Sequence, residues 1–476
     1  MKLPTTIEAC HELILKQNAL IEQLIGRVEI LEQQSKKNSK NSNKPPSSDG
    51  LKKRPAFPRK KGKKRGGQKG HKGSKLQIVI DKARIDETHS IYPDVCQTCG
   101  SPFSDLAKTK ALLGEIRQEF DLPAPKLLIR EYQQMEISCS CCQTRNKGEF
   151  PTHIKASTQY GSGVKSLTVL LNSGFAMPVK KVQSLFVDLF GYKINESTIV
   201  NNSITCSEQL EPVEAIIKQR LNEATLGHSD ETGIRVAGKL HWLHVFANTL
   251  YTFFFVHQKR GKEALEDDQS ILPTFSLKGG WVVHDCWSSY FKFKGIKHAL
   301  CGAHILRELY ALEENDTIWA KWFRRYFLTL LHLTRENDIQ TNQAVLNEQQ
   351  QHKARLLFKK ICQLADEIEP KPQKQQGKRG RPKATKGRNL LNRLIQHQDA
   401  VLAFAFFEEV PFTNNLAERD LRPIKTKQKV AGCFRTFQGA QRHARIFGFI
   451  STVRKNQLNI FNELKYVFQG HKSSFI

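Results

Sequence analysis

Apolar side chains near the start of the chain recur every seven residues. The first position of this repeat holds Ile7, Ile14, Ile21 and Val28, and the position three residues further on holds Cys10, Gln17, Leu24 and Leu31. β-Branched residues at the first position favour a parallel two-stranded coiled coil, and a buried Gln17 would fix its register at some cost in stability. A single amphipathic helix docked on its own chain is the alternative. We predict a coiled coil over residues 1–35.

Apolar residues at helical spacing return between residues 157 and 222. The pattern is carried by Leu167, Leu170, Leu171, Val182, Leu185, Phe186 and Leu189, and Asn195 is suited to cap the next helix. Residues 179–200 read as helix, glycine and helix, which resembles a helix-turn-helix, although most such pairs only pack together. DNA recognition and plain packing therefore both stay open for this region.

From residue 225 the pattern changes to that of strands. Residues 225–236, 240–248 and 251–257 predict three adjacent strands, and a helix over 261–269, strands over 281–285 and 298–301 and a helix from His304 follow. This order is that of the RNase H-like fold, in which carboxylates from the first strand, the end of the fourth strand and a late helix meet at one edge of the sheet. Further helices are predicted over 305–333 and 342–368.

The length of 476 residues and these patterns predict a multidomain α+β protein. The expected parts are an N-terminal coiled coil (1–35), a disordered basic arm (36–80), a small zinc-binding β domain (81–155), a helical DNA-binding region (156–222), the first part of an RNase H-like catalytic core (223–310), a helical insertion with a basic loop (311–400), and a catalytic helix with the C-terminal region (401–476).

Charge points to a polyanionic partner. The chain has 74 Lys and Arg against 46 Asp and Glu, a net charge of +28, and residues 36–75 alone hold 16 basic residues and one acid. Such a segment buries too little apolar surface to fold, and it can lie along the phosphates of a nucleic acid. The alternative to this role is nonspecific adhesion. Its predicted DNA-binding residues are Lys60, Lys61, Lys63, Lys64 and Arg65. The start of the chain lacks a signal-peptide segment and no membrane span is present, so we expect an intracellular protein.

Cysteine spacing indicates zinc. Cys96 and Cys99 form one C-x-x-C pair, and Cys139 and Cys142 form a second pair that is separated from the first by 39 residues, with Cys141 as a competitor of Cys142. Four thiolates from two such pairs make a closed tetrahedral site for one structural Zn²⁺. Strands are predicted between the pairs, over residues 115–120 and 127–132.

Two aspartates stand where a buried strand would not tolerate a lone charge. Asp230 lies in the first predicted strand and Asp285 ends the fourth. A buried charge is costly unless it is paired or coordinates metal, so a salt bridge is the alternative to a functional site. The positions of the two together favour the functional interpretation.

A third carboxylate is supplied by Glu418. Asn415 could cap a helix with Glu418 as its third residue, which equally describes a capping box without catalysis. Arg422 and Lys425 follow on the same side of that helix, unless a kink at Pro423 turns Lys425 away.

Three other acids compete for this role. Glu408 and Glu409 precede a proline and belong to the connection before the helix, and Asp420 points about 200° around the helix from Glu418. Asp230, Asp285 and Glu418 are therefore the predicted ligands of two Mg²⁺ or Mn²⁺ ions, which suit oxygen ligands and catalyse in-line displacement at phosphorus.

Two further motifs are less specific. Arg379 and Arg381 lie in an Arg-Gly-Arg-Pro sequence, the core of an AT-hook for a narrow A·T minor groove, and a basic loop without sequence preference is equally compatible. Cys301 and His304 resemble half of a metal site, and without a second pair a packing or supporting role is favoured.

The motifs together resemble the DDE transposases of the insertion-sequence-sixty-six family, the large transposase subunit of those bacterial elements. The resemblance is carried by Lys-Pro-Pro-Ser-Ser-Asp at 44–49, Gly-Gly-Gln-Lys-Gly-His at 66–71, the cysteine pairs, Asp-Glu-Thr-Gly at 230–233, Asp-Cys-Trp-Ser-Ser-Tyr at 285–290, Cys-Gly-Ala-His at 301–304 and Asn-Asn-Leu-Ala-Glu-Arg at 414–419. It implies transposition of the element in the bacterial cytoplasm, at the nucleoid, with Asp230, Asp285 and Glu418 as metal ligands.

The expected function follows from these features. We predict binding to the terminal repeats of the element and to target DNA, metal-dependent strand cleavage and strand transfer, and a homodimer or higher oligomer, with small accessory proteins of the element as possible partners. Two alternatives remain: an RNase H-like nuclease or resolvase that cuts without joining, and a zinc-dependent DNA-binding regulator.

Overall fold

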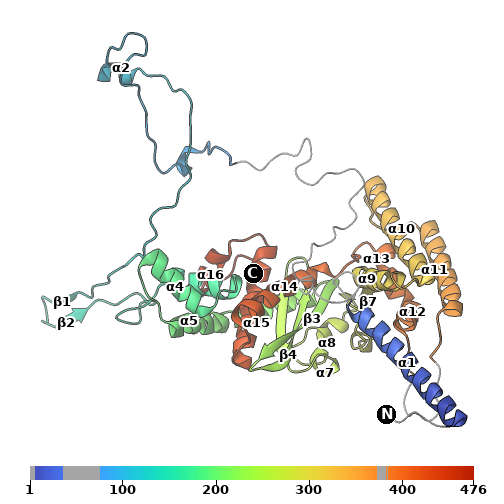
Figure 1. Cartoon of the computed structure of the whole chain (residues 1–476). Coiled ribbons are helices and arrows are strands. Elements are labelled where there is room, and N and C mark those ends of the chain that lie inside the picture. Colours follow the sequence, from blue (N-terminus) through green and yellow to red (C-terminus); the bar gives the residue numbers. More distant parts are fainter. Residues whose placement is uncertain (1–5, 36–75, 373–381, 383, 476) are drawn as a thin grey trace. The chain divides into compact units, whose positions relative to one another are not determined.

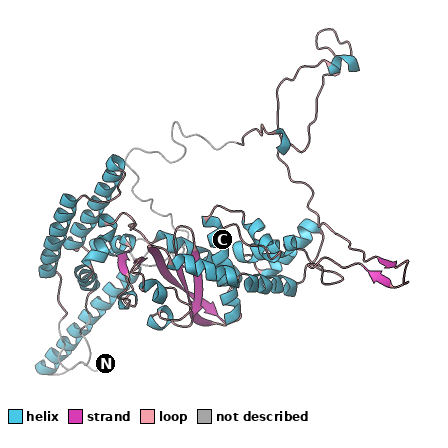
Figure 2. Ribbon diagram, turned by 180° about the vertical axis from the view of Figure 1, so that it is seen from behind, coloured by secondary structure: helices cyan, strands magenta, loops and turns pink. Residues whose placement is uncertain are grey.

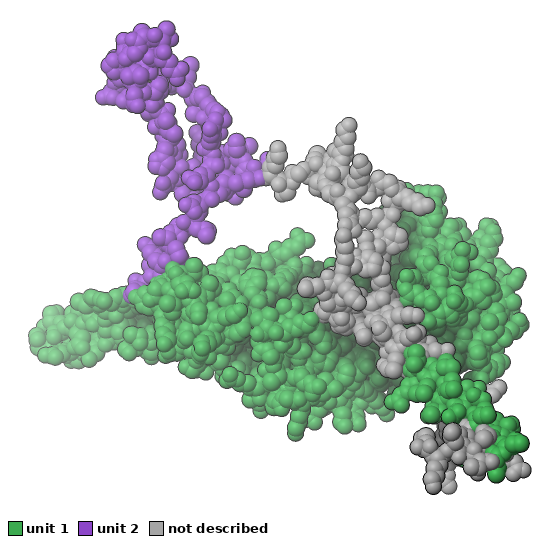
Figure 3. Space-filling view, in the orientation of Figure 1, with its two compact units in different colours: residues 1–50, 130–476 green, residues 51–129 purple. Residues whose placement is uncertain are grey.

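The computed structural model describes residues 6–35, 76–372, 382 and 384–475. It divides into two compact units, residues 51–129 and the remainder of the chain (Figure 3). The basic arm, apart from residues 76–80, and the two arginines of the Arg-Gly-Arg-Pro motif lie outside the described residues. No helix in the described part is long and apolar enough to cross a membrane.

A five-stranded mixed sheet forms the centre of the larger unit (Figures 1 and 2). Its strands are β3 (Leu226–Val236), β4 (Lys239–Ala247), β5 (Thr252–His257), β6 (Trp281–His284) and β7 (Lys297–Leu300), in the spatial order β5-β4-β3-β6-β7. The first three are antiparallel neighbours, whereas β3, β6 and β7 run parallel. All five strands lie where the hydrophobic pattern predicts them, to within about two residues.

Helices cover both faces of this sheet. One face packs on α14 (Asn415–Ala431) and α15 (Phe437–Lys455), through side chains such as Val245 and Phe447. The other packs on α6 (Glu211–Asn222), α7 (Lys262–Leu265) and α8 (Leu272–Ser276), through side chains such as Phe246 and Phe275. Alternate residues of β3, β4 and β5 thus point into separate cores, as strand geometry requires.

The helical region that precedes the sheet packs against the end of the chain. It contains α3 (Ser162–Val169), the π-helical turn η3 (Leu170–Gly174), α4 (Val179–Phe190) and α5 (Glu196–Gln209). The last two are joined through Gly191, whose φ of 68° suits glycine, and they share a small core with Phe186 and Ile199. Val169 and Cys206 pack with α15 and with α16 (Ile460–Phe468).

The region between β7 and α14 is helical, as predicted. It contains α9 (Gly302–Glu313), α10 (Ile318–Thr341), α11 (Glu348–Ile368), α12 (Lys386–Gln396) and α13 (Gln398–Phe406). The helix expected over 305–333 is therefore two helices, separated where Asp316 has a φ of 58°. One apolar cluster runs from Val283 of β6 to Phe358 of α11, so this region shares its core with the edge of the sheet.

The prediction of two strands between the cysteine pairs is wrong. Residues 115–120 and 127–132 form neither strand nor helix, and Ile129 is 75% exposed. The side chain of Gln118 bonds to the backbone amide and carbonyl of Val79, which is a side-chain contact and not strand pairing. A strand needs a partner for its backbone groups and a core for its apolar face, and both are lacking here.

The remaining described elements are short or stand alone. These are α1 (Ile7–Ser35), the 3₁₀ turn η2 (Lys82–Arg84), α2 (Asp105–Thr109), the 3₁₀ turn η4 (Tyr290–Lys292), and the hairpin of β1 (Glu136–Ser138) and β2 (Arg145–Lys147). The helix predicted over 261–269 is reduced to the single turn α7.

Candidate active site

Strand register brings Asp230 and Asp285 to the same level of the sheet. His228 of β3 is paired with Val283 of β6 in parallel register, and each aspartate follows two residues later. Asp285 comes directly after the last residue of β6. Since side chains two residues apart share a face of a strand, Asp230 and Asp285 face the side of the sheet that carries α14.

Asn414 fixes the start of α14 on this face. Its Nδ2 donates to the carbonyl of Ser229 at 2.8 Å, its Oδ1 lies 3.0 Å from Nδ1 of His228, and its backbone amide donates to Sγ of Cys301 at 3.2 Å. The first turn of the helix is thereby held to β3 and to the residue that follows β7. Glu418, four residues later, is the fourth residue of the helix.

The expected cap by Asn415 is therefore wrong. Asn415 is already helical, and the residue before it, Asn414, uses its side chain on β3 instead of on the helix amides. Glu418 is thus not part of a capping box. Its carboxylate faces His304, with Nδ1 to Oε1 at 3.8 Å, and the guanidinium groups of Arg307 and Arg422, each 3.9 Å from Oε2.

The three predicted carboxylates influence one another. Burial raises the pKa of Asp230 well above its usual value, and the neighbouring charges of Glu231, Asp285 and Glu418 raise it further. Mutual repulsion of this kind is relieved when a divalent cation binds between the carboxylates. Asp285 is held by the amide of Trp287 at 3.1 Å and lies 3.9 Å from Nη2 of Arg260.

Glu231 and its partners were missed by the sequence analysis. The Glu231 carboxylate is buried on the opposite face of β3, where it accepts from Nε of Arg260 at 2.7 Å and from the hydroxyl of Tyr290 at 2.8 Å. The Arg260 guanidinium also stacks 3.8 Å from the ring of Trp287. An acid beside Asp230 in a buried strand was a signal that a cation must lie nearby, but the sequence did not show which one.

Two of the competing acids, Asp420 and Glu409, have other partners. Asp420 accepts from Thr252 of β5 at 2.9 Å and from Ser451 and Lys455 of α15 at 2.9 Å and 2.7 Å. Glu409 accepts from Nε1 of Trp281 at 3.0 Å. Asp420 therefore ties α14 to α15 and β5, on the side of the helix away from Glu418.

The two predicted DNA-binding residues of α14 have different surroundings. Arg422 is 66% exposed next to Glu418, and Lys425 donates to the carbonyl of Gly233 at 2.7 Å. The helix continues through Pro423. The other predicted basic contacts lie outside the described residues: Arg379, Arg381, Lys60, Lys61, Lys63, Lys64 and Arg65.

Each cysteine pair forms a tight turn. Gly100 donates its amide to the carbonyl of Cys96, and Gln143 donates to that of Cys139, with a positive φ at both residues. Bonds to Ser101 lower the pKa of the exposed Cys99 thiol to about 7, and bonds to Thr144 lower that of Cys142. Cys96 and Cys99 belong to the smaller unit and the second pair to the larger one, so a zinc ion shared by all four stays a prediction.

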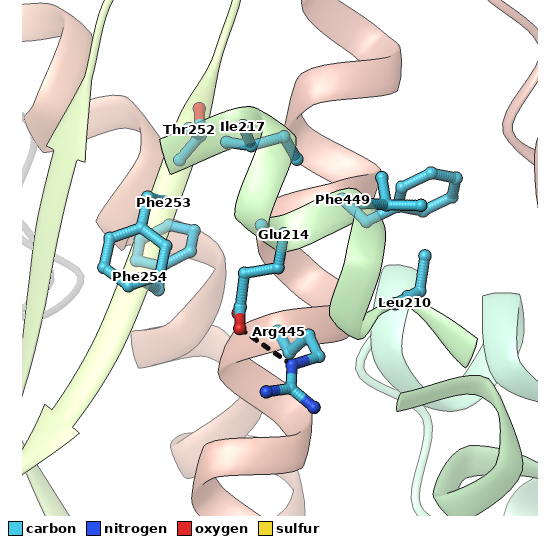
Figure 4. Close-up of a pocket in the computed structure, with 10 residues that line it drawn as sticks. Leu210, Glu214, Ile217, Thr252, Phe253, Phe254, Arg445 and Phe449 are labelled. Carbon is cyan, nitrogen blue, oxygen red and sulfur yellow. Dashed lines mark hydrogen bonds and ion pairs between the residues drawn. The ribbon is translucent and has the colours of Figure 1, made fainter. Parts of the chain in front are cut away.

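The pocket in Figure 4 is not part of the carboxylate site. It lies between α6, β5 and α15, and Glu214 and Arg445 meet beside it at 2.9 Å. Its volume of about 10 Å³ has room for no more than a water molecule.

The carboxylate site falls within a known family. Residues 157–442, more than half of the chain, match the family described as "Transposase IS66 family". The chain belongs to this transposase family. The match spans the helical region, the sheet, the helices between β7 and α14, and all three carboxylates.

Membership of the IS66 family makes the protein a transposase, an enzyme of DNA transposition that binds DNA. Residues 4–77 match a second family, described as a family of unknown function (DUF6444). No curated protein matches the chain.

Proposed function

We propose that this IS66-family transposase binds the ends of its element and carries out metal-dependent DNA cleavage and strand transfer. The observation that carries the proposal is the placement of three carboxylates, Asp230, Asp285 and Glu418, on two adjacent parallel strands and the helix over them. The strand order, with three antiparallel strands followed by two parallel ones, supports an RNase H-like catalytic core.

The residues fit two Mg²⁺ or Mn²⁺ ions. Asp230, Asp285 and Glu418 offer oxygen ligands. Burial, and then repulsion by the neighbouring carboxylates, raises the pKa of Asp230, and Oε1 of Glu418 is buried without a hydrogen-bond partner among the described residues. When bound, the ions would activate a water or a 3′-hydroxyl and stabilise the leaving oxygen. Arg260 holds Asp285 from the side, and Asn414 fixes the helix that bears Glu418.

Basic residues around the site provide the DNA contacts. Arg422 is exposed one helical turn from Glu418, where it can contact the phosphate backbone beside the scissile bond. We extend this role to Lys425, to Arg379 and Arg381 as minor-groove contacts, and to the basic arm with Lys60, Lys61, Lys63, Lys64 and Arg65 as a nonspecific phosphate contact.

The N-terminal parts have organising roles in this proposal. Cys96, Cys99, Cys139 and Cys142 bind one structural Zn²⁺, and α1 mediates self-association as a coiled coil, since two element ends must be brought together. Ile14 and Ile21 of α1 are each 52% exposed, which leaves the apolar stripe of the repeat available to a second copy.

Cleavage of DNA that carries the element's own ends tests the proposal. The full chain should nick or cut this DNA with Mg²⁺ and not with EDTA, and Asp285→Asn should be inactive while the exposed connection variant Glu408→Gln stays active. A second DNA substrate with a precut end measures strand transfer separately from cleavage. Cutting without joining would instead identify a nuclease, and binding without either reaction a DNA-binding regulator.

A further inference from the structure

The first turns of two helices meet at Glu418. Cys301 is the residue before α9, and His304 lies in its first turn. Glu418 lies in the first turn of α14. The amide of Gly302 donates to the carbonyl of Phe412 at 2.8 Å, and the amide of Asn414 donates to Sγ of Cys301, so these turns are joined on both sides.

The ligand atoms of these three side chains are close together. Sγ of Cys301, a ring nitrogen of His304 and a carboxylate oxygen of Glu418 all lie within 4.8 Å of one another. Nδ1 of His304 and Oε1 of Glu418 face each other at 3.8 Å, which is too long for a hydrogen bond. Both atoms are buried, and neither has a hydrogen-bond partner in the described part of the chain. Buried polar atoms left without partners are costly, and a bound ion is one way to satisfy them.

We propose that Cys301, His304 and Glu418 form a binding site for one transition-metal ion of the zinc class. A thiolate, an imidazole and a carboxylate are three ligands typical of Zn²⁺, and they leave a fourth tetrahedral position open. The sulfur and nitrogen ligands favour zinc over Mg²⁺, which prefers oxygen. The site is therefore separate in its metal preference from the oxygen-only set of Asp230, Asp285 and Glu418.

Glu418 is common to both sets of ligands. Its Oε1 faces His304 and its Oε2 faces Arg307 and Arg422, so the two oxygens have different surroundings. Zinc bound at Oε1 draws the carboxylate toward α9 and competes with its use beside Asp230 and Asp285. On the basis of the proposed function, this site therefore makes the transposase sensitive to inhibition by zinc. The positive charge of Arg307 opposes the ion and limits its affinity, so the inhibition is reversible.

Metal content of the full chain tests the site without any DNA. After equilibration with Zn²⁺ and removal of free metal, Cys301→Ser should hold about one zinc less per chain than the wild type, because serine is not a zinc ligand. Serine can still accept the hydrogen bond from the amide of Asn414, so we expect this variant to fold. Cys362→Ser, a variant at another buried thiol, is the matched control and should hold as much zinc as the wild type.

Binding of Co²⁺ provides a second measurement. His304→Asn provides a second variant, which is used if Cys301→Ser does not fold. Co²⁺ bound to the wild type should add thiolate-to-metal absorption that both variants lack, beyond the signal of the other cysteines. We expect the affinity for this ion to fall at least about 100-fold in either variant. Loss of a residue that only supports a metal ligand, without binding the metal itself, causes a smaller decrease. Equal metal content and equal spectra in wild type and variants would overturn the site.

Inhibition by zinc is measured in a separate experiment. For each protein, the rate of Mg²⁺-dependent cleavage with added zinc is divided by the rate without it. Zinc should lower this ratio in the wild type and in Cys362→Ser, and much less in Cys301→Ser. Equal inhibition of all three would overturn the competition for Glu418. Absence of cleavage in every protein would count against the proposed function, while the metal content would still decide the zinc site.

Discussion

The sheet region and the N-terminal region of residues 76–155 differ in how much core they have. Strands β5 and β6 are buried along almost their whole length, and apolar side chains from both faces enter extended clusters. In residues 76–155 apolar side chains such as Ile91 and Leu112 are 93% and 95% exposed. The comparison shows that a strand pattern produces a strand only where a partner and a core are available. A region that lacks a core needs another source of stability, and a metal ion is the one its cysteines offer.

The largest expected effect concerns two acids on one helix of the sheet region. Glu418→Gln should keep its fold and DNA binding but lose Mg²⁺-dependent cleavage by several orders of magnitude, because a metal ligand loses its charge. Asp420→Asn should instead lower the free energy of unfolding by about 2 kcal/mol, since Lys455 loses a charged hydrogen-bond partner. Cleavage assays and urea unfolding of both variants separate the two roles. Normal cleavage by Glu418→Gln with loss in Asp420→Asn would mean that the carboxylate triad is wrong.

The second prediction is that bound zinc stabilises the N-terminal region of residues 76–155 in place of a hydrophobic core. Cys142→Ser in the full chain should lose about one tightly held zinc per chain and become protease-sensitive within residues 76–155, because four thiolates close a structural site. The sheet region should keep its thermal transition. Cys141→Ser is the matched control and should retain the zinc. If Cys141→Ser loses zinc and Cys142→Ser does not, the fourth ligand has been assigned to the wrong cysteine.

A third prediction concerns α1, which like residues 76–155 exposes apolar side chains. Ile14→Lys with Ile21→Lys should reduce the mass of the protein in solution, measured by light scattering, since charges would replace the apolar stripe. Ala19→Lys with Gln23→Lys adds the same charge at other positions of the repeat and should leave the mass unchanged. An unchanged mass in the first variant would exclude this helix as the main interface.

The smallest expected effect is a gain in stability within the sheet region. The raised pKa of Asp230 means that the folded protein holds this proton more tightly than the unfolded chain does. Stability is therefore lost as the pH rises from near 3.8 through the raised pKa, when the carboxylate ionises beside Glu231, Asp285 and Glu418. In EDTA, Asp230→Asn should stabilise the protein by about 1 kcal/mol at pH 8 and by less at pH 5.

Urea unfolding at the two pH values measures this gain, with the exposed Asp188→Asn as the control. A gain that does not depend on pH would mean that ionisation of Asp230 is not its cause.

The sequence by itself determined the features that depend on local patterns. Short apolar segments of strand length placed the five strands of the sheet, and the two aspartates were chosen as site candidates because a lone charge is unfavourable in a buried strand. Helical periodicity was enough to separate Glu418 from Asp420, since residues two apart on a helix point in different directions.

Only the tertiary structure decided which distant residues surround those positions. Asn414 bonds to Cys301 across 113 residues of chain and to Ser229 across 185, and no local pattern reveals such a contact. The tertiary fold also brings Cys301 and His304 close to Glu418, and Arg260 close to Glu231. It also decided that residues 115–120 and 127–132 form no strand, because strand formation depends on partners that the chain must bring from elsewhere.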